Sequence, residues 1–545
     1  MASTVYRRLW SAQASSNLGI WMHVVVAQWV VLNISGSAVL VALVQTAIAL
    51  PMVLLAAPAG VLADVLDRRG LLILIQIAMA VLGGALALTT WLGNSSAGVV
   101  LTVTFLIGCG TAFLWPAWQA IQPELVPRAQ LAQAASLGAV NVNVARVLGP
   151  ALGGVLLAAV GAGAVFGLVG ALFGLAAVAV ASWSRTVIPD PVGRERVLRG
   201  LRSGARYVRH ARSMRRVLVQ SLLFVPAATA LWALLPVLAK SELHLGAQGF
   251  GVLLGALGVG GLCGTLALPG VRRHVSTDDL VTGAFALYAV CLGVLAMTSS
   301  PAVVFLLLAG AGAAWLALLS TLNAMAQLAL PEWVRARALS YFIAAVGGSQ
   351  AIGGVVWGVL DSFVGLRATL LSAAAALAAL AVIARRSPLI DPSALDPTPS
   401  VRHPPSEVDD VLEADDGPIL VTVDYRVRIG EVDGFRQAMV AVAGVRRRTG
   451  ARRWRLYWDP AVPQRYLETF VVASWEEHRR QHLGRMTVLD RTLVEALDSY
   501  LEVPLVVCHL AAVDVDFGTR RNKAPVHRFA RRRATSGSGR SSPEM

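Results

Sequence analysis

Charged residues are scarce along most of this chain, and their scarcity excludes an ordinary soluble protein. Asp, Glu, Lys and Arg make up 14% of the 545 residues, whereas soluble domains are about a quarter charged. Residues 38–63 and 97–121 contain none of the four, and a helix needs about 20 predominantly apolar residues to cross a bilayer. With 56% hydrophobic residues and a mean hydropathy of +0.63, the composition predicts a protein that crosses a membrane many times.

Cysteines and nucleotide-binding motifs are also scarce. The four cysteines, Cys109, Cys263, Cys291 and Cys508, are scattered singly. Their spacing predicts neither a disulfide framework nor a metal site. No G-x-x-x-x-G-K-[ST] phosphate-binding loop occurs in the sequence. We therefore expect no cofactor, no metal ion and no nucleotide-driven step.

Long apolar segments separated by short loops fill the region before the C-terminal tail. Their lengths predict an all-α polytopic membrane protein with twelve transmembrane helices. The expected spans are residues 9–33, 38–63, 70–92, 97–121, 130–159, 161–184, 214–239, 248–270, 278–298, 301–330, 337–360 and 363–384.

Lysine and arginine fall in alternate loops of this arrangement. One set of loops carries almost all of them, including the dense run from Arg185 to Arg216, while the other set holds only Lys240 and Arg367. Basic loops are retained on the cytoplasmic side of a membrane. We therefore expect a multi-pass protein of the cell (inner or plasma) membrane with both termini in the cytoplasm.

The two halves of the apolar region repeat each other in parallel. Identical residues recur at matching positions in three pairs of segments, and the first pair shares two arginines. A duplicated six-helix unit is an architecture of secondary transporters, which bind their substrate between the repeats. The paired segments are GVLADVLDRR (60–69) with GTLALPGVRR (264–273), QAIQPELV (119–126) with QLALPEWV (327–334), and ALGGV (151–155) with AIGGV (351–355).

Two of these segments resemble signatures of the major facilitator superfamily. GVLADVLDRR is similar to the charged loop after the second span in that superfamily, with Val65 in place of a basic residue and Asp67 in place of a glycine. ARVLGPALGG (145–154) resembles the Gly-Pro-x-x-Gly-Gly motif of its exporters. The resemblance covers residues 5–386, and the tail extends it to the branch of enterobactin exporters and transmembrane secretion effectors. It implies proton-coupled export of a siderophore or drug-like molecule by alternating access.

The resemblance assigns a conformational gate to the charged loop. Asp64 at the end of the second span would face the positive N-terminal end of the eleventh span, and the contact would break when the halves rock. The alternative is that these residues only mark the membrane edge, where arginines are attracted to anionic headgroups. The candidate gate residues are Gly60, Asp64, Asp67, Arg68, Arg69, Arg335 and Arg337.

The exporter motif places Gly149, Pro150, Gly153 and Gly154 in the fifth span. A proline kinks a helix, and small residues four apart let helices approach closely. Ordinary tight packing is the alternative interpretation. Because the eleventh span repeats the glycine pair, we expect packing to be part of the role.

Polar side chains inside the spans are costly and are therefore candidates for contact with a small-molecule substrate. Arg146 is the foremost, because an uncompensated arginine must face a cleft or pair with helix carbonyls, and it would attract an anionic or catecholate-like substrate. Two other roles would explain such residues without a substrate. Asn and Gln often form hydrogen bonds between helices, and Trp often lies in the aromatic belt at the membrane interface. The candidates are Asn17, His23, Gln28, Trp115, Gln119, Asn141, Arg146, Asn323 and Gln327.

These residues do not reveal how transport is energised. Proton-driven relatives commonly carry a carboxylate in the first span or an arginine in the fourth. Here the first span has no acid and residues 101–115 have no arginine. His23 is titratable, but a lone histidine is more often a polar packing residue. Proton antiport therefore follows from the resemblance alone.

A soluble domain follows an acidic, proline-rich linker. Its apolar pattern predicts the order β-α-β-β-α-β of a ferredoxin-like α+β fold. It resembles the dimeric α+β barrels of antibiotic-biosynthesis-type monooxygenases. Trp475, His478 and His482 form the candidate site, because two histidines at i and i+4 share a helix face. No Cys, Asp or Glu completes a metal set, and the arginines at 479 and 480 disfavour a cation, so we expect no catalysis there. A homodimerisation or regulatory module is the expected role.

The chain ends in a basic, Ser- and Gly-rich tail. We expect this tail to be drawn to the anionic inner leaflet. Nucleic-acid binding is the rival interpretation of such a run, but fusion to twelve spans disfavours it. The expected parts are residues 1–184 (first six-helix half), 185–213 (basic linker), 214–386 (second half), 387–417 (acidic linker), 418–515 (ferredoxin-like domain) and 516–545 (basic tail).

The sequence is compatible with three functions. The first is a non-enzymatic exporter. The second is a membrane-anchored sensor or scaffold whose functional module is the C-terminal domain. The third is an enzyme in which a monooxygenase-like tail domain modifies what the bundle moves.

Overall fold

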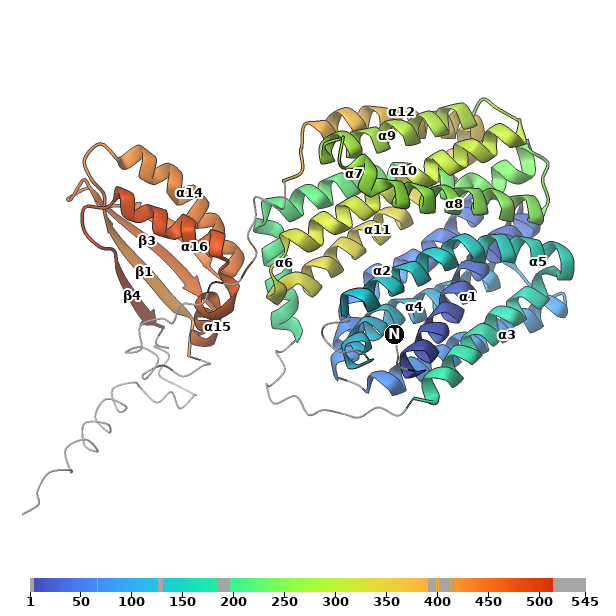
Figure 1. Ribbon diagram of the computed structural model, residues 1–545, viewed down its shortest axis with the longest axis horizontal. Coiled ribbons are helices and arrows are strands. Elements are labelled where there is room, and N and C mark those ends of the chain that lie inside the picture. The colour runs from blue at the N-terminus through green and yellow to red at the C-terminus, as the bar shows by residue number, and fades with distance from the viewer. Residues whose placement is uncertain are drawn as a thin grey trace, which may run out of the picture. The chain divides into compact units, whose positions relative to one another are not determined.

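The computed structural model describes residues 4–65, 67–125, 131–183, 197–390, 398, 400, 412 and 416–512 (Figure 1). Side chains are not described at 56–58, 60–65, 119–120, 122–124, 131–133, 135–136, 139, 197–202, 332 and 336. The chain divides into two compact units. The helical unit is Met1–Leu201, Ser213–Gln327 and Leu339–Ile390, and the C-terminal unit is Arg202–Arg212, Leu328–Ala338 and Asp391–Met545.

Long α-helices lying side by side build the helical unit (Figure 1). A shorter helix, α6 (Val197–His210), lies in the basic segment expected as a linker, and a π-helix (Leu238–Glu242) extends α7. The long helices are α1 Thr4–Ser35, α2 Ala38–Val65, α3 Arg68–Trp91, α4 Ala97–Leu125, α5 Leu131–Ala181, α7 Arg212–Val237, α8 Ala247–Val271, α9 Thr277–Leu295, α10 Pro301–Ala329, α11 Glu332–Val364 and α12 Leu366–Arg385.

Within the described part of the chain, eleven helices are long and apolar enough to cross a membrane, one fewer than the twelve expected. The difference lies in α5, which covers both the fifth and the sixth expected span. A straight helix of its 51 residues would be about 76 Å long, against about 30 Å for the hydrocarbon core of a bilayer, but α5 consists of two helices that meet at a kink. Gly161 (φ 79°, ψ 166°) is the one residue inside α5 with non-helical dihedral angles. A single glycine therefore stands where a loop was expected.

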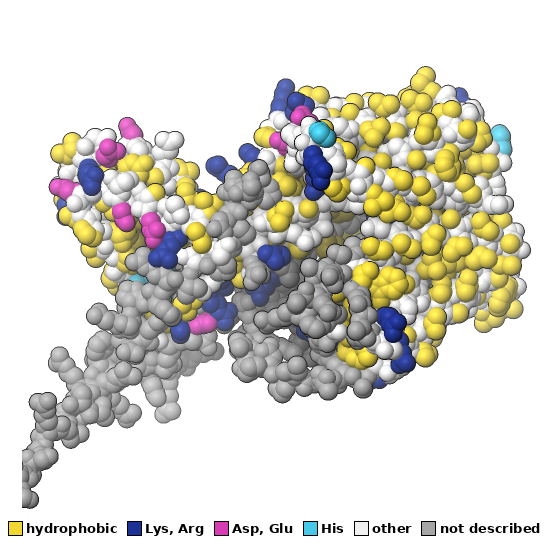
Figure 2. Space-filling model, in the orientation of Figure 1, with side chains coloured by type: hydrophobic (Ala, Val, Ile, Leu, Met, Phe, Trp, Pro, Cys, Tyr) yellow, Lys and Arg dark blue, Asp and Glu magenta, His cyan; other side chains and the backbone are white. Residues whose placement is uncertain are grey.

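The outer surface of the helical unit is apolar. Leu74, Val178 and Leu306 are 66%, 68% and 73% exposed. Figure 2 shows hydrophobic side chains spread over this unit, with most of its visible lysines and arginines toward one end of the helices. Exposed apolar surface of this extent is unfavourable in water. The distribution is that of a bundle surrounded by lipid.

Glycines form close contacts between the first and second six-helix halves. A Cβ atom added to Gly154 of α5 would lie 2.5 Å from the Cα of Gly251 in α8. A Cβ added to Gly358 of α11 would lie 2.7 Å from the Cβ of Ala42 in α2. Helices α5 and α11 occupy equivalent places in the sequence repeat, as do α2 and α8. The two contacts therefore reflect the internal duplication.

Residues 416–512 form a four-stranded antiparallel sheet with helices over one face (Figure 1). Alternate residues of the first strand, from Ile419 to Tyr425, are buried. Val423 and Tyr425 pack with Phe435, whereas Ile419 and Val421 pack with Trp475. Along the chain the order is β-α-β-β-α-β, as expected. The strands are β1 Ile419–Arg426, β2 Arg452–Trp458, β3 Arg465–Val472 and β4 Val506–Ala511, in the spatial order β2-β3-β1-β4, and α14 is Val432–Thr449.

The second helix in the predicted β-α-β-β-α-β order is broken into several short pieces. The sequence pattern over residues 476–501 predicts one continuous helix, and that prediction was wrong. Helix α15 (Trp475–Arg480) passes into a π-helix (Gln481–Arg485), and α16 (Val488–Glu495) begins afresh before a 3-10 turn (Ala496–Tyr500). Thr487 and Asp490 form a capping box at the start of α16. The capping box satisfies the free N–H groups of a new helix end, which makes the interruption stable.

Candidate functional site

Arg146 of α5 lies with its guanidinium group against an indole ring. Its Cζ is 5.2 Å from the ring centroid of Trp21 in α1, a distance typical of a cation–π contact. Its Nε is buried and has no hydrogen-bond partner among the residues that the structure describes. A buried donor without a partner is costly. An acceptor group on a ligand would relieve that cost.

Trp21 begins a row of aromatic rings that crosses from the first half to the second. It lies 6.4 Å from Trp232 of α7, which lies 5.7 Å from Trp315 of α10, measured between ring centroids. Trp315 contacts Phe224 of α7 at 5.7 Å and Tyr288 of α9 at 6.3 Å. We call these five residues the aromatic cluster. Within the described chain the Nε1 of Trp232 is also a buried donor without a partner.

Two predicted cavity residues instead join α1 to α5. The Nδ2 of Asn17 donates to the Oδ1 of Asn141 at 3.0 Å, and the Nδ2 of Asn141 donates to the carbonyl oxygen of Trp10 at 2.9 Å. Asn141 is 2% exposed. These contacts are interhelical hydrogen bonds, the role that Asn and Gln often have in place of substrate contact.

His23 is fully buried between α1 and α4. Its Nε2 lies 3.0 Å from the Oγ1 of Thr104, and that hydroxyl donates to the carbonyl oxygen of Val100. The imidazole Nε2 is therefore the donor, and Nδ1 keeps its lone pair. Nδ1 has no partner in the described part of the molecule. Gln28 donates to the carbonyl oxygen of Trp232 at 3.4 Å, which links α1 to the aromatic cluster.

The remaining predicted cavity residues lie elsewhere. Trp115 is 37% exposed, Asn323 and Gln327 are exposed, and the side chain of Gln119 lies outside the described ones. Sequence reasoning missed Trp232 and Trp315. The available signal was position, because Trp315 lies midway along α10, whereas tryptophans of the interfacial belt lie near helix ends.

The exporter motif packs α5 against neighbouring helices. A Cβ on Gly149 would lie 2.5 Å from the Cβ of Trp21, and one on Gly153 would lie 3.3 Å from the backbone of α1. Pro150 lies within continuous helix. The small residues therefore let α1 approach closely enough for Trp21 to stack on Arg146.

Two predicted gate residues of the helical unit contact helix ends. The carboxylate of Asp67 accepts from the backbone N–H of Gly70 at 2.9 Å and caps α3, whose first residue is Arg68. The Nη2 of Arg69 donates to the carbonyl oxygen of Ala181 at 2.6 Å, at the end of α5. Both contacts satisfy backbone groups that helix ends leave unpaired.

Two further predicted gate residues, Arg335 and Arg337, belong to the C-terminal unit. Arg335 donates to the carbonyl oxygen of Leu330 at 3.2 Å, and Arg337 donates to the Oγ of Ser203 in α6 at 3.3 Å. The structure does not describe the side chain of Asp64 or the exposure of Gly60. The contact expected between Asp64 and the start of α11 therefore stays a prediction.

Polar and aromatic contacts join the two halves where α1 and the α7 extension end. The Nζ of Lys240, on the π-helix, donates to the Oδ1 of Asn33 at 2.7 Å. Trp29 stacks on Phe250 at 5.6 Å with 18° between the ring planes. We call the Lys240–Asn33 contact the end latch. It must break before the halves can part at this end.

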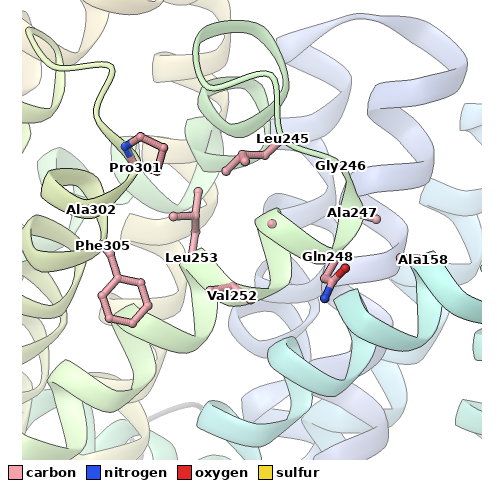
Figure 3. Close-up of a pocket in the computed structure, with 11 residues that line it drawn as sticks. Ala158, Leu245, Gly246, Ala247, Gln248, Val252, Leu253, Pro301, Ala302 and Phe305 are labelled. Carbon is pink, nitrogen blue, oxygen red and sulfur yellow. The ribbon is translucent and has the colours of Figure 1, made fainter.

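A cavity of about 690 Å³ lies between the starts of α8 and α10 and the middle of α5, close to Gly161 (Figure 3). Its volume is within the range of about 300–1,000 Å³ found for ligand pockets. The lining is apolar apart from Gln248, so it offers no charge to orient an anion, and none of the predicted site residues lines it. The lining residues are Ala158, Leu245, Gly246, Ala247, Gln248, Gly249, Val252, Leu253, Pro301, Ala302 and Phe305.

In the C-terminal domain, His478 lies in a cluster with Trp475, His482 and, unexpectedly, His509 of β4. The Nε2 atoms of His478 and His509 are 2.9 Å apart, and the rings of His478 and His482 are 4.8 Å apart. Burial lowers the pKa of His478 to about 3, and His482 adds to this effect. Among the described residues, no group of three His, Cys, Asp or Glu could hold a metal ion.

The sequence profile of the transmembrane secretion effector family (MFS_3) matches residues 1–513. The multidrug efflux pump Tap of Mycobacterium tuberculosis is 25% identical over 418 residues, which cover 71% of this chain and 94% of Tap. The staphyloferrin A transporter of Staphylococcus aureus is 27% identical over 50% of this chain and 69% of its own length. YfiS, an uncharacterized MFS-type transporter of Bacillus subtilis, is 30% identical, but the match spans only 31% of this chain and 40% of YfiS.

Solved transporter structures share the fold of the helices. A bacterial homolog of the human lysosomal transporter Spinster, inward-facing and unoccupied, aligns with a TM-score of 0.55 at 17% identity, over 70% of this chain and 96% of its own. The nucleoside transporter NupG aligns with a TM-score of 0.56 at 11% identity, over 71% of this chain and 99% of its own. At these identities the likeness concerns the fold alone.

Proposed function

This chain belongs to the transmembrane secretion effector family of major facilitator transporters, and from that premise we propose that it exports a small amphipathic molecule by alternating access. It is a multi-pass protein of the cell membrane, and its relatives include a multidrug efflux pump and a siderophore transporter. One observation carries the proposal: the Nε of Arg146 and the Nε1 of Trp232, which have no hydrogen-bond partner among the described residues, lie at an aromatic cluster to which both halves contribute. A site shared between halves changes shape when they rock.

The chemistry of the cluster favours an aromatic or apolar molecule with an anionic group. Trp21 and Trp232 offer ring faces, and Arg146 offers a positive charge in a setting with little water. Aromatic pairs contribute about 0.5–1.5 kcal/mol beyond burial, and hydrogen bonds to charged groups contribute about 1.5–3 kcal/mol. A catecholate-like siderophore or an anionic drug fits this combination better than a cation does.

The experiment is an accumulation assay in cells that lack their own efflux pumps. Cells expressing the protein should retain less of a fluorescent aromatic anion than control cells. Arg146→Gln should restore retention, while Arg146→Lys should give an intermediate level. Val144→Ala, at a 42% exposed position of the same helix, is the matched control and should export normally. Normal export by Arg146→Gln would refute the site, and no export by the wild type would refute the function.

We also propose that α5 crosses the membrane twice by turning at Gly161, which makes twelve crossings. The alternation of basic loops supports a cytoplasmic location for both termini.

Proton coupling is proposed from the family alone. Uptake into inverted vesicles with and without a pH gradient tests it, and independence from the gradient would remove proton antiport.

For the C-terminal domain we propose a ferredoxin-like module that pairs with a second copy and has no enzymatic activity. The strand order β2-β3-β1-β4 supports the fold. The sheet face away from the helices carries Tyr457, Val506 and Leu510, which are 52%, 64% and 49% exposed. A second copy of this face would cover them. Crosslinking of the full chain in membranes tests the pairing.

Deleting residues 388–545 separates the three competing functions. Retained export would make the domain accessory. If the full chain exports nothing, the sensor or scaffold hypothesis gains. A covalently altered export product that disappears with the deletion would support the enzyme hypothesis.

Residues 516–545 lie outside the described ones, so their attraction to anionic lipid stays a prediction.

A further inference from the structure

Within the C-terminal unit, the small domain holds helix α6 through one buried carboxylate. Glu477 of α15 accepts from Arg206 of α6 at 2.8 Å. It also accepts two hydrogen bonds from Arg485 of its own domain, at 2.7 and 3.1 Å. The side chains of Arg206, Glu477 and Arg485 are 15%, 16% and 4% exposed. Glu477 thus lies between two arginines and is paired with both.

Arg485 extends the same contact to the start of α11. Its Cζ lies 4.9 Å from the ring centroid of Trp333, and Trp333 packs edge-on against Tyr207 of α6 at 5.8 Å. One turn further along α11, Arg337 donates to Ser203 of α6. Helix α6 and the first turns of α11 are therefore held together, and the C-terminal domain supplies the central ion pair.

The network depends on the charge of Glu477. Burial alone would raise the pKa of Glu477, but the guanidinium groups of Arg485 and Arg206 outweigh burial and hold the pKa at about 2. Removing one partner of a buried ion pair leaves the other charge uncompensated and is strongly destabilising. The neighbouring Glu476 pairs with Arg480 on the same helix at 2.9 Å and is 35% exposed, and such a pair contributes little.

We propose that the C-terminal domain is a built-in brake on transport: by holding α6 to the first turns of α11, it stabilises the conformation in which the end latch is closed. The proposal rests on export by alternating access. The segment Leu328–Ala338 contains the predicted gate arginines, so a contact that fixes this segment opposes their rearrangement. A contact made in one conformation favours that conformation by its differential free energy. Opening of the end latch is therefore the step that the brake should slow.

The test uses the full-length chain with its four native cysteines replaced by serine. Ala239, fully buried beside Lys240, is changed to cysteine, and its labelling by a membrane-impermeant maleimide reports opening of the latch. Glu477→Gln should speed labelling at least about fivefold, the factor that about 1 kcal/mol produces. Glu476→Gln, the matched control, should label like the parent.

Arg206→Gln guards against a folding defect of the domain, because it breaks the same ion pair from the α6 side. It should also speed labelling. Equal labelling of Arg206→Gln and the parent, or slower labelling of Glu477→Gln, would overturn the brake. Labelling needs no substrate, so a wild type that exports nothing would refute the proposed function while these rates still decide the brake.

Discussion

Replacing Gly154 by alanine should force α5 and α8 apart. The added methyl group would lie 2.5 Å from the Cα of Gly251 and 2.8 Å from the carbonyl oxygen of Ala247. Both are backbone atoms, so no side chain can rotate away. Carbon atoms pack at about 3.5–4.0 Å, so the helices must separate by roughly 1 Å. Overpacking of this kind costs about 1–3 kcal/mol.

Gly167, on the same helix, provides a matched control. Its added Cβ would lie 3.7 Å from the Cβ of Ala87, which is an ordinary contact. Alanine is favoured over glycine inside a helix by about 1 kcal/mol. Gly167→Ala should therefore be neutral or stabilising, and the opposite signs of the two substitutions separate helix packing from helix propensity.

Thermal unfolding of the purified protein in detergent and export from cells measure the effect. Gly154→Ala should melt at a lower temperature, because overpacking costs about 1–3 kcal/mol of stability, and it should export more slowly than the wild type. Gly167→Ala should keep both properties. If Gly154→Ala melts and exports like the wild type, the close contact of α5 with α8 does not join the halves and the reasoning is refuted.

Other contacts give predictions of the same kind. Cysteines at Asn33 and Lys240, joined by a short bismaleimide, should arrest export, and continued export after crosslinking would show that the end latch need not open. Trp232→Phe should leave the melting temperature unchanged, since its Nε1 has no partner among the described residues, but it should raise the KM for an aromatic anion severalfold; an unchanged KM would place the substrate elsewhere. The pKa of His478 is held at about 3 in the folded domain, against about 6.5 in the unfolded chain. Its contribution to the free energy of unfolding is therefore fully present above about pH 6.5 and is lost as the pH falls toward 3. The loss amounts to at most about 1.4 kcal/mol per pH unit. Thermal unfolding of the full chain from about pH 8 to 4 should show a shallower slope for His478→Gln, and an equal slope would contradict a buried, neutral imidazole.

Features that depend on neighbouring residues could be predicted from the sequence. Each span is a local run of apolar side chains, and the glycines of the exporter motif predict the close approach that Gly149 and Gly154 make. The boundary at Gly161 was predicted, but one glycine with a positive φ replaces the expected loop. The sequence also contains a signal for the break before α16, which the prediction of one continuous helix overlooked: Thr487 and Asp490 have the spacing of a helix start.

Contacts between distant segments could not be predicted. Trp21, Trp232 and Trp315 come from three helices, and no periodicity within one helix indicates which rings meet. Arg206 and Glu477 lie far apart in the chain, and each belongs to a charged run that reads as an exposed surface. Their pairing depends on how the C-terminal unit folds, which local patterns do not encode.

Uptake of a radiolabelled aromatic anion into inverted membrane vesicles tests the central claim most directly. The wild-type protein should accumulate the anion and its neutral analogue, and Arg146→Gln should lose at least about tenfold in initial rate for the anion alone, the lower bound set by a charge-assisted hydrogen bond of about 1.5–3 kcal/mol. Equal rates of Arg146→Gln and the wild type on the anion, or no accumulation of either compound by the wild type, would contradict the account.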